Sequence, residues 1–476
     1  MASSRANRPP ICECEYTYIL TGTRAHPAVF PRPLNCGGAT MNTAEPAGQR
    51  PARTSLFHNR NFSLLFAGSS ISAVGDQFTL VALPWLVLKL TGDPAALGLV
   101  LAAMAFPRAV FMLVGGAVVD RMSPRRVLLG ARAVNAACIV ILAALVLTSI
   151  QMWMVYLLAL GIGLSTAFAY PAGSAILPQL LEPQQLRAGN AAFMGMRQLS
   201  MIGGPILAGF VIAWGAHHSL AAHAPPGAGG LGLAFTIDAA SFLCSLGSLA
   251  MIRIGGDAHR PRHTEGVLAS IAAGIRYVWA DVPLRAFVLY ASFVSVFVGG
   301  PIQVGLPLLA DTRMDLGAAS LGILVTAQGL GMLAGSFLSG LGQRLMRGHL
   351  GVMVLTIDSL GGLTLAALSQ VHATGTGAAL LLFTGVLAGI VQIAIITWIQ
   401  QRVTATMMGR SMSILMFMFM GLGPLSAALA GALLKLISLT ALFAIAGGTL
   451  TAIALICLAV PQMRSIRAVH AEGVKP

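Results

Sequence analysis

Charged residues are scarce in this chain: they make up 9% of its 476 residues, whereas 56% are hydrophobic. An ordinary soluble domain carries about 25% charged residues. A water-soluble fold of this length could not hide so much apolar surface, because a large part of its residues must face water. The composition therefore argues against a soluble enzyme and predicts that lipid surrounds most of the chain.

The sequence also lacks the motifs that would indicate ATP, a metal or a disulfide framework. No Gly-x-x-x-x-Gly-Lys-Ser/Thr loop occurs, so ATP cannot drive the protein directly. Cys12 and Cys14 have the wrong spacing for a zinc site, and the histidines at 217, 218 and 223 have no Cys or carboxylate beside them. We therefore expect no metal, no cofactor and no enzymatic activity.

The net charge of +14 does not indicate nucleic-acid binding, because Lys and Arg stand in ones to threes between apolar runs. These runs have about the 20 residues that a helix needs to cross a bilayer. We place twelve spans, at 62–90, 95–119, 127–149, 152–178, 190–214, 231–254, 284–310, 317–343, 350–370, 375–400, 411–435 and 437–460. The predicted fold class is an all-α membrane protein with twelve transmembrane helices in two pseudo-symmetric six-helix bundles.

The distribution of basic residues predicts the topology. With the N-terminus inside, the inner loops hold 13 Lys and Arg residues, and the outer loops hold only Lys89, Arg313 and Lys435. Cytoplasmic loops carry such an excess of positive charge. We therefore predict a multi-pass protein of the cell inner membrane with both termini in the cytoplasm.

The chain divides into five predicted parts. Residues 1–54 are polar and aperiodic, which indicates disorder, and Met41 opens a segment that resembles an ordinary bacterial start, so translation is hypothesised to begin there. The parts are a disordered segment (1–54), an N-terminal bundle (55–254), a cytoplasmic linker with an amphipathic helix (255–283), a C-terminal bundle (284–463) and a cytoplasmic tail (464–476).

Short motifs match between the two halves at an offset of about half the membrane region. Leu97-Gly98 in the second span matches Leu321-Gly322 in the eighth, and Gly204-Pro205 in the fifth matches Gly423-Pro424 in the eleventh. Repeated sets of six helices form two bundles around a central site. The prolines, with the nearby Gly209, predict bends or close helix contacts, and ordinary helix packing is the alternative.

The loop between the second and third spans carries Gly116, Asp120, Arg121, Arg125 and Arg126. It resembles the Gly-x-x-x-Asp-Arg-x-Gly-Arg-Arg loop of the major facilitator superfamily, with two residues, Ser and Pro, in place of the single Gly. The resemblance implies that these five residues form a cytoplasmic latch against the eleventh span. The alternative is that their charges only orient the loop.

Other motifs resemble one branch of that superfamily, which contains enterobactin-exporter-like and macrolide-efflux-like proteins. They are Gly75-Asp76-Gln77, Pro171–Pro178, Leu186–Asn190, Gly204-Pro205 with Gly209, Asp238–Phe242 and Gly409-Arg410. The resemblance covers roughly residues 55–460. It implies an exporter, and an importer or a lysolipid flippase of the same fold is the alternative.

Ionisable residues inside spans are functional candidates, because placing one in lipid costs about 2.5–3.5 kcal/mol or more. Asp76 lies about 21 Å from the inner end of its span, and Arg108 about 18 Å above Asp120, at 1.5 Å per residue. We predict that Asp76 and Arg108 approach each other. Asp76 is then a candidate proton-responsive carboxylate, and a permanent ion pair is the alternative.

Further polar residues in the spans could line the cavity or form gate contacts. Simple pairing or bonding between helices would explain them equally well. They are Arg132, Arg197, Asp238, Gln303, Gln328, Asp358 and Gln392. Together these features predict a monomeric secondary transporter that exports small amphipathic molecules, of the drug or siderophore class, in exchange for protons across the lipid bilayer.

Overall fold

The computed structural model describes residues 56–182, 184–217, 228–252, 267–345, 349–403 and 422–464. These residues belong to one structural unit, Thr54–Pro476. The described part is helical and contains no strand. Its long helices are α1 (Arg60–Thr91), α2 (Pro94–Arg121), α3 (Pro124–Leu147), α4 (Met152–Leu180), α5 (Leu186–His217), α6 (Ala228–Ala250), α8 (Val282–Arg313), α9 (Ala318–Leu345), α10 (Leu350–Ala367), α11 (Thr374–Arg402) and α13 (Leu439–Ala459).

These eleven helices are each long and apolar enough to cross a membrane. A shorter apolar helix, Leu422–Leu433, falls in the predicted eleventh span, whose first part lies outside the described residues. Short segments complete the described structure: η1 (Leu56–His58), α7 (Val267–Ala280), η2 (Leu368–Gln370) and α14 (Pro461–Arg464). The all-α membrane fold predicted from hydropathy is therefore confirmed.

Local sequence determines where the helices begin and end. The Asn59 side chain accepts hydrogen bonds from the backbone N–H groups of Asn61 and Phe62, which caps the start of α1. Gly92 ends α1 with a φ of 62°, a conformation that glycine adopts without steric cost. Asp93 then caps α2 and is followed by Pro94 at its first turn.

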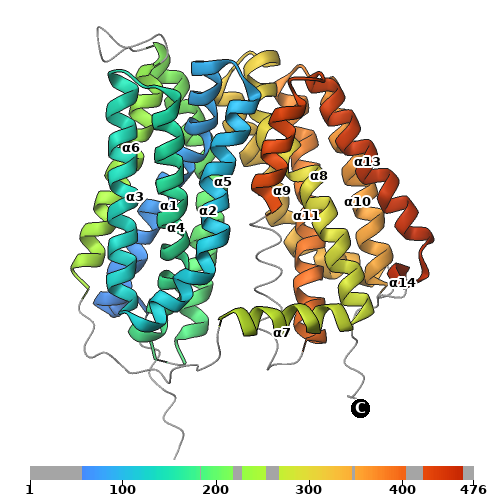
Figure 1. Ribbon diagram of the computed structural model, residues 1–476, viewed down its shortest axis with the longest axis horizontal. Coiled ribbons are helices and arrows are strands. Elements are labelled where there is room, and N and C mark those ends of the chain that lie inside the picture. The colour runs from blue at the N-terminus through green and yellow to red at the C-terminus, as the bar shows by residue number, and fades with distance from the viewer. Residues whose placement is uncertain are drawn as a thin grey trace, which may run out of the picture. The chain divides into compact units, whose positions relative to one another are not determined.

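The helices form two sets with matching pairings. In the first set, α2 packs on α4, α1 on α6, and α3 on both α4 and α6. In the second set, α9 packs on α11, α8 on α13, and α10 on both α11 and α13. Figure 1 shows α1–α6 and α8–α13 as separate groups of ribbons. The order of pairing is that of a six-helix unit repeated once, as the matched motifs predicted.

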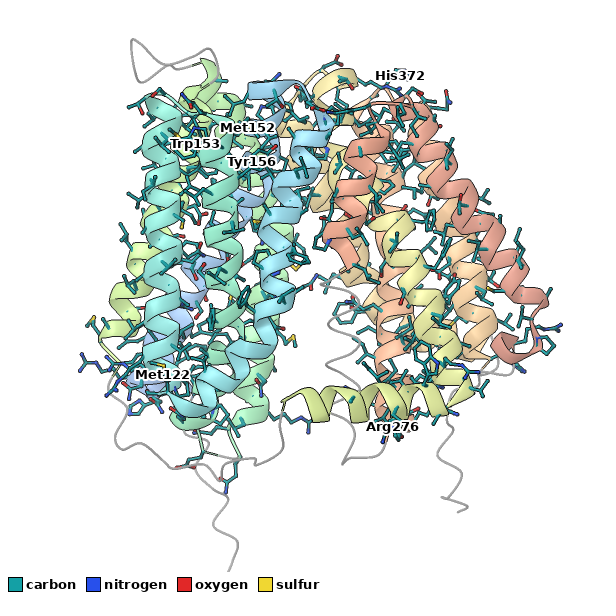
Figure 2. The ribbon with its side chains drawn as sticks, viewed as in Figure 1. Met122, Met152, Trp153, Tyr156, Arg276 and His372 are labelled. Atoms are coloured by element: carbon teal, nitrogen blue, oxygen red, sulfur yellow. The ribbon has the colours of Figure 1, made fainter. Side chains whose placement is uncertain are left out.

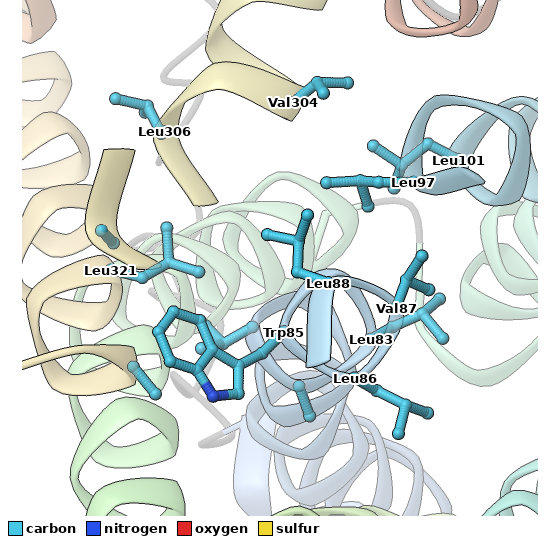
Figure 3. Packing of buried hydrophobic residues seen from close by; sticks show 14 of the residues in the cluster. Leu83, Trp85, Leu86, Val87, Leu88, Leu97, Leu101, Val304, Leu306 and Leu321 are labelled. Atoms are coloured by element: carbon cyan, nitrogen blue, oxygen red, sulfur yellow. The ribbon is translucent and has the colours of Figure 1, made fainter. Parts of the chain in front are cut away.

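Buried apolar side chains join the two sets at one end of the helices. One cluster contains residues of α1, α2, α8 and α9, and Figure 3 shows Trp85 and Leu88 of α1 beside Leu321 of α9. This end is the one at which α1 finishes and α2 begins, and we call it the Thr91 end. A second cluster, which includes Phe287 and Trp398, contains residues of the second set together with Val278 of α7.

Helix α7 lies between the two sets in the chain, within the predicted linker. It runs crosswise to the long helices in Figure 1. Val278 is buried, whereas Ile275 and Trp279 are about half exposed. In Figure 2, Arg276 of α7 and Met122 lie at one end of the long helices, and Trp153 and His372 lie at the other, the Thr91 end.

Candidate functional site

A carboxylate is completely buried near the middle of α6. Asp238 is 0% exposed, and its Oδ2 accepts a hydrogen bond from Thr79 Oγ1 of α1 at 2.5 Å. Ser241 Oγ donates to its Oδ1 at 3.2 Å. Gly75 makes this arrangement possible, because a Cβ at that position would lie 2.5 Å from Asp238 Oδ1. The Gly75-Asp76-Gln77 motif therefore brings α1 against this carboxylate.

Asp76, the next residue in α1, is exposed although it lies within the long apolar helix. The positive charges of Arg132 on α3 and Arg197 on α5 act on it, and its own charge acts on Asp238. Two carboxylates and two guanidinium groups from four helices of the first set therefore interact at mid-helix depth. Placing such a cluster in lipid costs free energy, and clusters of ionisable residues at this depth mark transport pathways.

Arg132 holds three helices of this set together. Its guanidinium donates to Ser69 Oγ of α1 at 2.9 Å and to Ser245 Oγ of α6. Its hydrogen bonds therefore go to hydroxyl groups of the first set. The gate role expected for this residue remains a prediction.

Arg108 lies in α2 and is not ion-paired to Asp76 among the described residues. Helix α2 packs mainly on α4, so neighbours in the sequence are not the closest neighbours in space. The charge of Arg197, from α5, acts on Arg108. The Nε of Arg108 is buried and has no hydrogen-bond partner in the described part of the chain.

The second set contains a simpler polar pair. Tyr290 of α8 donates its hydroxyl hydrogen to Asp358 Oδ2 of α10 at 2.7 Å. Gln303 and Gln392 are exposed, whereas Gln328 is half-buried. The amino-acid sequence does not predict the Tyr290–Asp358 hydrogen bond, because Tyr290 and Asp358 are 68 positions apart.

The Gly-Pro element of α5 touches both α1 and the other set. A Cβ at Gly204 would lie 2.5 Å from the Cβ of Gln77, so α5 packs closely on the α1 motif. A Cβ at Gly209 would lie 2.6 Å from the Ala318 carbonyl oxygen of α9, and Gly322 faces Pro205. The matched motifs Gly204-Pro205 and Leu321-Gly322 therefore meet in space.

The other matched motif makes the equivalent contact. A Cβ at Gly98 of α2 would lie 2.5 Å from the Ala427 carbonyl oxygen, and one at Gly431 would lie 2.6 Å from the Pro94 carbonyl oxygen. Gly423 and Pro424 precede these residues in the helix Leu422–Leu433 and are both buried. Backbones of the two sets can approach this closely only because glycines lie between them.

Two ion pairs also join the sets at the Thr91 end. Lys89 Nζ lies 2.7 Å from Asp311 Oδ1, and Lys435 Nζ lies 3.0 Å from Asp93 Oδ2. Lys89 also lies over the Trp85 ring, 5.1 Å from its centroid. The sequence marked both lysines as outer-loop charges, but it could not reveal their partners, which come from the opposite half of the chain.

Replacing both lysines by Gln should loosen this end of the molecule. Each ion pair is half exposed and stabilises the contact between the two sets only weakly. We therefore expect the form in which the sets are separated at the Thr91 end to become about two- to tenfold more populated. The measurement is maleimide labelling of an Ala96→Cys probe, since Ala96 is buried at this end. A labelling rate equal to that of the parent protein would contradict the role of the two pairs.

The Lys435–Asp93 ion pair should not depend on pH in the neutral range. The hydrogen bond from Lys435, followed by that from the Ala95 backbone N–H, lowers the pKa of Asp93 below 3.8. A lowered pKa means that the pair is intact above pH 3.8 and is lost only as pH falls through the lower value. The Lys435→Gln effect should therefore be the same at about pH 5 and about pH 8.

The predicted latch lies partly outside the described residues. The side chains of Gly116, Asp120 and Arg121 and the stretch 404–421, which includes Gly409-Arg410, are not described. Arg125 donates to the Ala250 carbonyl oxygen at the end of α6, at 2.8 Å, and Arg126 is exposed. The latch therefore stays a prediction.

A pocket of about 610 Å³ lies between α1 and α5. Among the described residues, Ser70 and Ser200 supply the polar side chains of its lining. The lining also includes Val74, two residues before Asp76 in α1, and Gly204 of α5. The described lining residues are Phe66, Ser70, Val74, Ala192, Gly195, Met196, Leu199, Ser200, Gly203, Gly204 and Leu207. An apolar molecule or the apolar part of an amphipathic molecule fits such a surface.

Residues 65–428 match the family model described as Major Facilitator Superfamily. The chain belongs to the Major Facilitator Superfamily. This membership agrees with the two matched sets of helices and with the resemblance of the loop at 116–126. The protein is therefore a multi-pass membrane transporter, and its family and fold are those of transporters rather than of enzymes.

Two curated relatives are exporters by name. The multidrug efflux pump Tap of Mycobacterium tuberculosis (strain ATCC 25618 / H37Rv) is 28% identical over 437 residues, which cover 85% of this chain and 94% of the pump. The enterobactin exporter EntS of Shigella dysenteriae serotype 1 is 25% identical over 353 residues, which cover 73% of this chain and 79% of the exporter. The branch indicated by the sequence motifs is thus confirmed.

Solved structures share the fold. The nucleoside transporter NupG aligns with a TM-score of 0.64 at 14% identity, over 84% of this chain and 98% of that protein. A bacterial homologue of the iron transporter ferroportin, in its inward-facing state, aligns with a TM-score of 0.60 at 17% identity, over 83% and 98%. At this identity the likeness concerns the fold alone.

Proposed function

We propose that this protein is a proton-driven exporter of small amphipathic molecules. The observation that carries the proposal is the similarity to a multidrug efflux pump over 94% of that pump's length. The apolar pocket between α1 and α5, with charged groups beside it, suits molecules that have an apolar body and a polar group.

In the proposed topology, the protein spans the inner membrane and both of its termini lie in the cytoplasm. It rests on the excess of Lys and Arg in the loops on one side, 13 against 3. In this orientation the Thr91 end faces outward. The two ion pairs and the glycine contacts would then close the outer side, so the described arrangement would be open to the cytoplasm.

Transport would proceed by alternating access. The two sets of helices would rock against each other, and the contacts of Gly98 with Ala427 and of Gly209 with Ala318 would form and break in each cycle. On the cytoplasmic side, the residues of the loop at 116–126 would close the path in the other state. A monomer contains all of these parts.

Asp76 is the proposed proton carrier. It is exposed, it lies beside the charged groups of α3 and α5, and no ion pair within the described residues fixes its charge. Asp238 is a weaker candidate, because it is fully buried and held by Thr79 and Ser241. A carboxylate that exchanges protons must be reached by water in at least one state.

The test is an accumulation assay in a host that lacks its own efflux pumps. Cells that express the protein should accumulate less of a set of fluorescent amphipathic dyes than cells with the empty vector. A proton uncoupler should remove the difference, because the gradient would supply the driving force. Equal accumulation with and without the protein, for every dye tested, would contradict export, and higher accumulation would indicate import.

A further inference from the structure

The first set of helices contains more positive than negative charge at mid-helix depth. It holds three arginines, Arg108, Arg132 and Arg197, and two carboxylates. The charges of Arg132 and Arg197 act on Asp76, the charge of Asp76 acts on Asp238, and the charge of Arg197 acts on Arg108. Arg132 is held by two serine hydroxyls, and Asp238 is held by Thr79 and Ser241. The positive surplus therefore falls on the remaining arginines.

Arg108 and Arg197 lack a fixed anionic partner. Neither forms an ion pair or a hydrogen bond with another residue in the described ranges, although the charge of Arg197 acts on Asp76. The Nε of Arg108 is buried and has no hydrogen-bond partner among the described residues, while the residue as a whole is half-buried. Arg197 is exposed. Two guanidinium groups that repel each other inside an apolar bundle are costly unless an anion joins them.

Arg197 also adjoins the apolar pocket. It stands between Met196 and Leu199 of α5, which both line that pocket. Gly204, another lining residue, is seven positions further and so lies on the same face of the helix. The unpaired charge and the apolar surface are therefore next to each other on one helix.

We infer that Arg108 and Arg197 form a binding site for the anionic group of an amphipathic substrate, whose apolar part lies in the pocket between α1 and α5. A carboxylate, catecholate, sulfonate or phosphate would accept the charge-assisted hydrogen bonds that guanidinium groups donate. A cationic substrate would be attracted by Asp76 but repelled by Arg132 and Arg197, whose charges act on that carboxylate. This inference names the substrate class of the proposed exporter and rests on that function only for the direction of movement.

The test uses three probes that share a naphthyl body and differ in their head group. They are 2-naphthoate, 2-naphthylmethanol and 2-naphthylmethylammonium, and binding to the purified full-length protein in lipid nanodiscs is measured by titration calorimetry. We expect 2-naphthoate to bind about tenfold or more tightly than the alcohol, and the ammonium probe to bind weakest. Arg108→Gln and Arg197→Gln should each bring 2-naphthoate down to about the affinity of the alcohol.

Arg276→Gln is the matched control, because Arg276 is exposed on α7, away from the pocket lining, and its loss should change nothing. If a Gln variant does not purify as a folded protein, the Lys variant is measured instead, and it should retain the preference for the anion in weakened form. A preference for the ammonium probe, an equal affinity for all three probes, no binding of any of them, or an unchanged preference in both Gln variants would overturn the inference. Because the assay measures binding alone, failure of efflux in cells would leave its result standing.

Discussion

Asp76→Asn should abolish transport that depends on the proton gradient, and cells carrying this variant should accumulate dye to the level of cells without the protein. The amide has nearly the shape of the carboxylate but can neither take up nor release a proton. Because Asp76 is exposed and makes no hydrogen bond or ion pair with a described residue, the exchange should leave the packing of α1 intact. The measurement is dye accumulation with and without uncoupler, at equal amounts of inserted protein.

Asp315→Asn is the matched control for this result. Asp315 is exposed just before α9, away from the charged cluster, so the same chemical change there should leave accumulation unaltered. Full uncoupler-sensitive efflux by the Asp76→Asn variant would remove Asp76 from the mechanism and transfer the question to Asp238 and Asp358.

Gly98→Leu and Gly322→Leu should each block the transport cycle. A Cβ at Gly98 would already lie 2.5 Å from the Ala427 carbonyl oxygen, and Gly322 faces the backbone of Pro205 equally closely. A leucine side chain would force the two sets apart at the Thr91 end. Overpacking of this kind costs about 1–3 kcal/mol, so the closed form should become about 5- to 150-fold less populated.

The measurements are efflux and the labelling rate of the Ala96→Cys probe, which should rise in both variants while the amount of inserted protein stays constant. Gly247→Leu and Gly361→Leu serve as controls in the first and second sets, since nothing lies within 4 Å of a Cβ at either position. Transport at the parent rate in both test variants would mean that the sets need not approach here.

The helices could be predicted because their signal is local. Eleven of the twelve predicted spans are long helices whose ends differ by a few residues from the prediction, and the first part of the eleventh span lies outside the described residues. α5, for example, begins at Leu186 rather than at 190. The amphipathic pattern of the linker and helix α7 depends equally on neighbouring residues in the sequence.

The contacts within the site could be predicted only in part. The sequence indicated that Asp76 and Arg108 lie at similar depth, but depth does not tell which faces of two helices meet. The structure instead has Arg132 bonded to serines of α1 and α6 and Arg197 acting on Asp76. Such partners come from helices far apart in the chain, and no local pattern specifies them.

The matched motifs gave more than their spacing implied. Leu97-Gly98 and Leu321-Gly322 predict a repeat, and the structure brings each of the two glycines against a helix that carries a Gly-Pro motif. A repeated sequence produces repeated contacts when its two copies face each other. No matched motif predicts the two ion pairs. Lys89 pairs with Asp311 and Lys435 pairs with Asp93, and none of these four residues belongs to a matched motif.

The ion pairs at the Thr91 end are arranged reciprocally. The first set supplies Lys89 and Asp93, and the second set supplies Asp311 and Lys435. Each set of helices thus contributes one cation and one anion to the ion pairs at the Thr91 end, so its two charges sum to zero. Separating the two sets at the Thr91 end would therefore move no net charge through the electric field of the membrane. A voltage-dependent step would have to arise at mid-helix depth, at Asp76 and the arginines that act on it.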